Sequence, residues 1–157
     1  MKFLKAVLVA ISVSLSAPAF AQPSTSSNME ILRQKVKADK KLLVAANMDL
    51  TEAQAKVFWP VYDAYQGDLE KINRRLAAMI QTYGNAYLKG SVPDDVARKL
   101  LAESISVDEA EAALKRTYVP RLEKAIPATK AVRYLQIENK IRAVVRFDLA
   151  AEIPLAD

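Results

Sequence analysis

Residues 50–83 read LTEAQAKVFWPVYDAYQGDLEKINRRLAAMIQTY, and this stretch decides the fold. Large apolar side chains recur in it at alternating steps of four and three residues, the spacing of one face of a helix of about seven turns. These seam residues are Phe58, Tyr62, Tyr65, Leu69, Ile72, Leu76, Met79 and Tyr83. Such a helix needs an apolar partner along its length, so the stretch predicts an all-α fold built on long helices.

The start of this helix is marked by Leu50, Thr51 and Gln54. The Thr51 hydroxyl can accept a hydrogen bond from the Gln54 backbone N–H, while the Gln54 side chain accepts one from the Thr51 N–H. This reciprocal pairing is a capping box. It predicts that Leu50, Thr51 and Gln54 determine the fold locally, as they would at any helix start.

Three further helices are predicted around the first. One is expected from the box at Ser27 to about Ala46, with Met29, Leu32, Val36 and Leu43 inward and Met48 in the connection that follows. Another is expected from about Pro93 to Ala125, with Ser91 as its cap. The last follows Pro127 and ends near Pro154. The apolar residues expected to face inward on these last two helices are Val96, Leu100, Val107, Leu114, Tyr118, Tyr134, Ile137, Ile141, Val144, Val145 and Leu149.

Prolines lie inside both long central helices, at Pro60 and Pro120. An interior proline lacks the N–H of a helical hydrogen bond and clashes with the preceding turn. We therefore expect each helix either to kink there or to stop and restart. The predicted architecture is four helices, with the two long central ones forming an antiparallel hairpin.

The first 21 residues have the pattern of an export signal: Lys2 and Lys5, a short apolar run, and Ala19-Phe20-Ala21 at the cleavage position. We expect cleavage after Ala21 and a periplasmic location. A retained N-terminal anchor is the alternative. Residues 22–27, QPSTSS, are predicted to be a disordered leader, and residues 28–157 a single all-α domain.

Composition argues against most catalysis and most metal sites. The chain contains no histidine and no cysteine, so it lacks the usual general base, the thiol nucleophile and the preferred zinc and copper ligands. Loss of Lys2 and Lys5 with the signal would lower the formal net charge from +5 to +3. For an exported protein with so small a charge we expect no nucleic-acid partner. We expect no enzyme activity, no cofactor and no metal.

Carboxylates occur in acid-first pairs with a basic residue four positions later, a spacing that supports exposed helix. The pairs are Glu70–Arg74, Asp94–Arg98, Asp95–Lys99, Glu111–Lys115 and Glu138–Arg142. All are interpreted as surface charge.

An exported, cysteine-free, four-helix chain with an L-T-x-x-Q box at Leu50–Gln54 resembles the Spy/CpxP family of small periplasmic all-α proteins. The resemblance implies an antiparallel dimer shaped as a shallow cradle, and either ATP-independent chaperone activity or control of an envelope-stress sensor. Where the family carries a second L-T-x-x-Q motif, this chain has Ile126-Pro127-Ala128-Thr129-Lys130. That departure places it in a divergent branch.

A basic face with scattered apolar side chains is the candidate surface for unfolded clients or an envelope partner. Its candidate residues are Arg33, Lys37, Lys40, Lys41, Arg74 and Arg75. The alternative is that these residues form an ordinary solvated surface. The chaperone hypothesis competes with an adaptor that docks on one partner, such as a sensor kinase, and with a protein that binds anionic lipid. The long seam also predicts a homodimer, unless the neighbouring helix of the same chain covers it.

Overall fold

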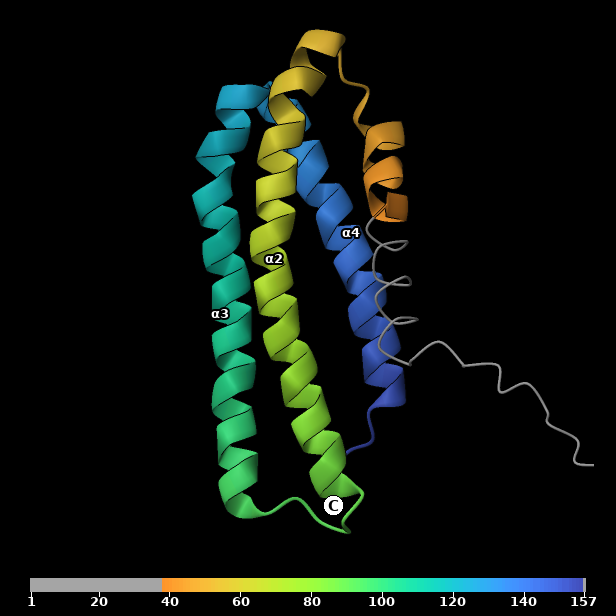
Figure 1. Ribbon diagram of the computed structural model, residues 1–157, viewed down its shortest axis with the longest axis vertical. Coiled ribbons are helices and arrows are strands. Elements are labelled where there is room, and N and C mark those ends of the chain that lie inside the picture. The colour runs from red at the N-terminus through yellow and green to blue at the C-terminus, as the bar shows by residue number, and fades with distance from the viewer. Residues whose placement is uncertain (1–37, 157) are drawn as a thin grey trace, which may run out of the picture. The chain divides into compact units, whose positions relative to one another are not determined.

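The computed structural model describes residues 38–156, and all of these except Ala38 belong to one compact unit, Asp39–Asp157. The expected signal peptide, the leader and the beginning of the first helix lie outside the described residues. The described residues form a helical segment, residues 38–48, followed by α2 (Glu52–Tyr87), α3 (Asp94–Ala125) and α4 (Ala128–Glu152), as Figure 1 shows. The described residues contain no strand, which confirms the all-α prediction.

The two longest helices, α2 and α3, pack against each other as a hairpin, with the turn between them at the bottom of Figure 1. Neither interior proline divides its helix, since α2 is continuous through Pro60 and α3 through Pro120. Of the two alternatives, a kink or a restart, the restart is therefore excluded at both positions. Both prolines lie in helices held by tertiary packing, which can offset the missing backbone hydrogen bond.

The capping box is present as predicted. The Gln54 backbone N–H donates to Thr51 Oγ1 at 3.3 Å, and the Thr51 N–H donates to Gln54 Oε1 at 3.2 Å. Leu50 packs against the core from just outside the helix. Ser91, in contrast, is not the cap of α3, because that position is occupied by Pro93, which makes no side-chain cap hydrogen bond.

The core lies where the helices meet beside the capping box. The first five seam residues of α2 are buried there, against Val107, Leu114 and Tyr118 of α3 and Tyr134 of α4. Aromatic rings pack edge to face within it: the centroids of Phe58 and Tyr134 are 5.2 Å apart. Such pairs add about 1 kcal/mol beyond their area burial.

The inward faces of the two outer helices differ from the prediction. Leu43 is exposed, and Val44 occupies the core instead. Met48, expected in a connection, is helical and fully buried; the chain turns after it at Asp49, which has a positive φ of 47°. The helix thus ends two residues later than predicted, and its inward face is formed by Val44 and Met48, which are four residues apart.

On α4, Val144 and Val145 are exposed, contrary to the prediction. Their places toward the hairpin are taken by polar residues, described below. No helix among residues 38–156 is both long and apolar enough to cross a membrane.

Candidate interaction surface

Four of the six candidate face residues are described, and each of them makes an ion pair. Lys41 Nζ lies 2.7 Å from Asp63 Oδ1 and over the ring of Trp59, 5.2 Å from its centroid. Arg74 pairs with Glu70 at 3.2 Å, as the sequence spacing predicted. Arg33 and Lys37 lie outside the described residues.

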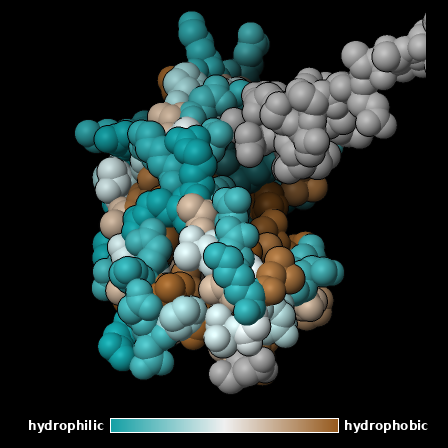
Figure 2. All heavy atoms as spheres, turned by 60° about the horizontal axis from the view of Figure 1, so that its bottom comes forward, coloured by the Kyte–Doolittle hydropathy of each residue, from teal (hydrophilic) through white to brown (hydrophobic). Residues whose placement is uncertain are grey.

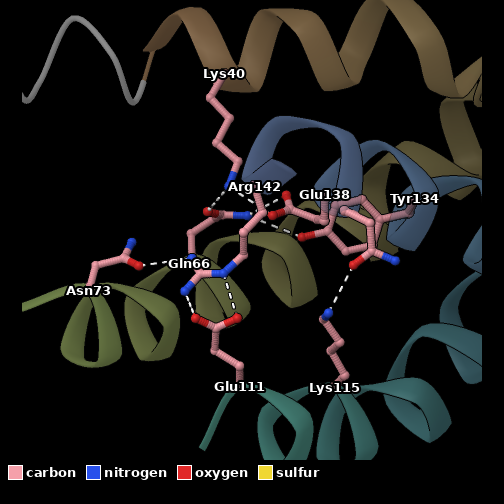
Figure 3. Close-up of polar contacts among 9 residues, drawn as sticks. Lys40, Gln66, Asn73, Glu111, Lys115, Tyr134, Glu138 and Arg142 are labelled. Carbon is pink, nitrogen blue, oxygen red and sulfur yellow. Dashed lines mark hydrogen bonds and ion pairs between the residues drawn. The ribbon is translucent and has the colours of Figure 1, made fainter. Parts of the chain in front are cut away.

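Lys40 lies at a junction of three helical elements. Its Nζ donates to Glu138 Oε2 of α4 at 2.8 Å and to Gln66 Oε1 of α2 at 2.9 Å. The Gln66 amide in turn donates to Glu138 Oε1 at 2.8 Å and to the Tyr134 hydroxyl at 3.1 Å, so the group forms a closed polar cluster (Figure 3). The Glu138 side chain is only 4% exposed. Lys40 therefore fixes the 38–48 segment to the hairpin and α4.

Arg75 makes a bidentate pair across the hairpin. Its Nε and Nη2 donate to the two oxygens of Glu103 on α3 at 2.8 and 3.1 Å, and Nη2 also donates to Ser106 at 2.7 Å. The same hydrogen bonds hold the pKa of the Glu103 carboxyl below its usual range and raise that of Arg75. Arg75 thus joins α2 to α3 while its side chain stays 39% exposed.

A second polar cluster was missed by the sequence reasoning. Glu111 of α3, expected at the surface with Lys115, is buried and pairs with Arg142 and Arg146 of α4. Arg142 Nε donates to Glu111 Oε2 at 2.5 Å, and its Nη1 donates to Asn73 of α2 at 2.9 Å (Figure 3). Burial lowers the pKa of Arg142 below its ordinary value.

The partner of Glu138 is likewise not the one expected. Glu138 pairs with Lys40 rather than with Arg142, and it belongs to the interior rather than the surface. The expected pairs Asp94–Arg98 and Asp95–Lys99 are present on the surface, at 2.9 and 3.6 Å. The signal for the buried acids was positional: Glu111 falls on the seam of α3, four residues after Val107 and three before Leu114.

The far half of the hairpin has no buried side chain. No residue from Asn73 to Ser106 is buried, and we call this segment the open end. The last three seam residues of α2, Leu76, Met79 and Tyr83, are only half-buried there. On α3, Leu101 is 66% and Ile105 is 62% exposed. Figure 2 brings this end forward and shows apolar atoms at the surface among polar ones.

The exposed apolar face of α3 at the open end continues to a residue that α4 contacts. Ile105 and Leu101 precede Asp108 by three and seven residues, which places all three on the same side of the helix. Asp108 accepts a hydrogen bond from Arg146 of α4 at 2.6 Å. Leu101 and Ile105 lie beyond this contact and are exposed.

An open cleft of about 420 Å³ lies between the end of the 38–48 segment and α4. Its lining residues are Asn47, Thr129, Arg133, Gln136, Ile137 and Lys140. None of them is acidic. Among residues 38–156 there is also no cluster of three or more acidic residues suited to a metal ion.

Comparison with known proteins adds no relative: no family model, no curated protein and no solved structure matches the chain.

Proposed function

We propose that this protein is a periplasmic, ATP-independent chaperone that holds unfolded envelope proteins on the open end of its hairpin. The observation that carries the proposal is the exposure of Leu101 and Ile105 on a segment without a buried side chain. Apolar side chains adjacent on one helix face offer an unfolded chain a weak, unspecific contact. The resemblance of Leu50–Gln54 to the Spy/CpxP motif supports the same class.

The basic part of this surface is supplied by Arg74 and Arg75 at its edge. Both guanidinium groups keep solvent exposure although they are paired with Glu70 and Glu103. The ion pair of Arg74 with Glu70 lacks the bidentate geometry of the Arg75 pair and contributes little stability, so this cation remains available to carboxylates of a client, whereas Arg75 is held by Glu103 and Ser106. Lys40 and Lys41 lie in the half with the buried core, where their contacts serve the fold.

Two copies are proposed to associate through the half-buried seam residues Leu76 and Met79. These residues continue the seam that α3 buries further along, so a second copy could complete their burial. Such a homodimer would place two open ends in one particle. Two weak client contacts on one particle hold a client more firmly than one.

The test is light scattering from a reduced, aggregating client with and without the protein expressed from Gln22. Suppression at stoichiometric amounts without ATP is the expected result; unchanged aggregation would remove the proposal. Pull-down from envelope extract separates a chaperone, which returns many proteins, from an adaptor, which returns one.

A further inference from the structure

The carboxyl-terminal half of α4 has its polar and apolar sides reversed. Its polar side faces the hairpin, where Arg142 and Arg146 pair with Glu111. Val144 follows Arg142 by two residues and so lies on the opposite side of the helix. It is 61% exposed, and Phe147 is 74% exposed. Two large apolar side chains on the outside of a helix whose inside is charged point to a partner on the outside.

These residues continue a stripe that begins in the cleft. Steps of four and three residues along α4 connect the members of what we call the outer stripe: Arg133, Ile137, Lys140, Val144, Phe147 and Ala151. Its first three residues line the cleft. The stripe spans about 27 Å of helix, so its basic half and its apolar half lie end to end on one face.

The cations of the outer stripe differ from the others on α4. Arg142 and Arg146 are satisfied by Glu111, Asp108 and Asn73, whereas Arg133 and Lys140 have no ion pair or hydrogen bond within the described part of the chain. The cleft that they line contains no carboxylate. The basic half of the stripe is therefore complementary to an acidic ligand.

A second copy of this chain does not fit the stripe. Parallel pairing would place Arg133 and Lys140 opposite the same cations, while antiparallel pairing would place Lys140 against Val144. Like charges opposite each other, or a cation buried against an apolar side chain, are both unfavourable. Charge thus favours a partner of different sequence.

We propose that the outer stripe of α4 binds an acidic amphipathic helix of another protein. Its carboxylates would meet Arg133 and Lys140 in the cleft, and its apolar residues would cover Val144 and Phe147. The stripe lies on a different helix from Leu101 and Ile105, and the two proposals rest on different observations. The stripe would give the protein one specific partner in addition to many unspecific clients.

The probe is a fluorescein-labelled helical peptide of about 20 residues. On the face that would contact the stripe, one half of the peptide carries glutamates and the other half carries leucines. A matched peptide carries lysines in place of the glutamates. We expect saturable anisotropy with the acidic peptide, reduced by salt, and at least about tenfold weaker binding of the basic one.

Two variants test the two halves of the stripe, the double substitution R133E/K140E and the single substitution F147D. Each should weaken the acidic peptide about tenfold or more. The control for charge is R116E, an exposed arginine of α3 outside the stripe, and the control for apolarity is V132D on α4. Thermal unfolding of every variant shows whether it is folded.

Three results would overturn the proposal: equal binding of both peptides, binding that F147D leaves unchanged, and self-association of the protein that F147D abolishes. Binding that F147D leaves unchanged would mean that the cleft alone binds, as a site for a small anion. Self-association that F147D abolishes would mean that the stripe binds a second copy of this chain. Because the readout is peptide binding, failure here leaves client protection by the open end intact.

Discussion

Arg142 of α4 and Glu111 of α3 form a buried ion pair, with side chains 16% and 8% exposed. Neither charge can be released into water without separating the helices, because Asn73 of α2 and Arg146 of α4 hold the same pair from their other sides. The pair therefore specifies how α4 lies on the hairpin. It also explains why the apolar residues of this part of α4 face outward.

Removal of one member of this pair should destabilise the fold strongly. Glu111→Gln leaves the Arg142 charge in the interior without its carboxylate, and we expect it to lower the free energy of unfolding by about 3 kcal/mol. Arg142→Met should cost less, because Glu111 keeps its ion pair with the half-exposed Arg146. Urea unfolding followed by circular dichroism measures the effect. The double variant should lose less than the sum of the two, since no buried charge of the pair remains; strict additivity would contradict the coupling.

The contact of Lys40 with Glu138 should control the attachment of the 38–48 segment. Lys40→Met removes two hydrogen bonds to the cluster, with an expected loss of about 2 kcal/mol. Hydrogen exchange should rise selectively in residues 38–48. Lys41→Met is the matched control, because its ion pair with Asp63 is exposed and should contribute less than about 1 kcal/mol.

The capping box predicts a graded series. Thr51→Ala should cost about 1 kcal/mol, because the Gln54 N–H loses its acceptor, whereas Thr51→Ser should be nearly neutral because serine retains the hydroxyl. Thermal unfolding distinguishes the two. Equal stability of the alanine and serine variants would show that the box does not stabilise α2.

The buried tyrosines should make the fold sensitive to alkali. Burial, reinforced by the Glu138 charge, raises the pKa of Tyr65 from 10.0 to about 12. An unfolded chain loses this proton near pH 10 and the folded chain only near pH 12, so stability is complete below pH 10 and falls between these values.

The Tyr65→Phe variant should therefore keep its stability at neutral pH and lose less of it between pH 10 and 12. Unfolding in urea at pH 7 and pH 11 measures the difference, which can reach about 1.4 kcal/mol per pH unit. Parallel curves for the variant and the parent protein would show that Tyr65 does not titrate with unfolding.

Local pattern was sufficient to predict the helices and their inward faces in the hairpin. The seam from Phe58 to Ile72 is buried as its spacing required, and the Thr51 cap lies where the box indicated. Pattern failed where tertiary contacts override the usual preference of a residue type. Buried acids such as Glu111 and Glu138 violate the rule that charges face water, and the cations that permit their burial lie 31 and 98 residues away in the sequence.

The role of the candidate face residues could be predicted from the sequence only in part. Sequence spacing shows that Lys40 and Arg75 lie on helices, but only the assembled structure shows that their charges bridge between helices. The open end could not be predicted from the sequence either. The apolar spacing of the α2 seam continues unchanged from Ile72 to Tyr83, but the seam residues after Ile72 are no longer buried.

The central claim is that the open end holds clients, and light scattering of an aggregating client with a variant of that surface tests it most directly. The double variant L101D/I105D should retain the fold, since both side chains are exposed, and should lose suppression of aggregation. The control V132D should suppress aggregation as fully as the parent protein. Undiminished suppression by folded L101D/I105D would contradict the account.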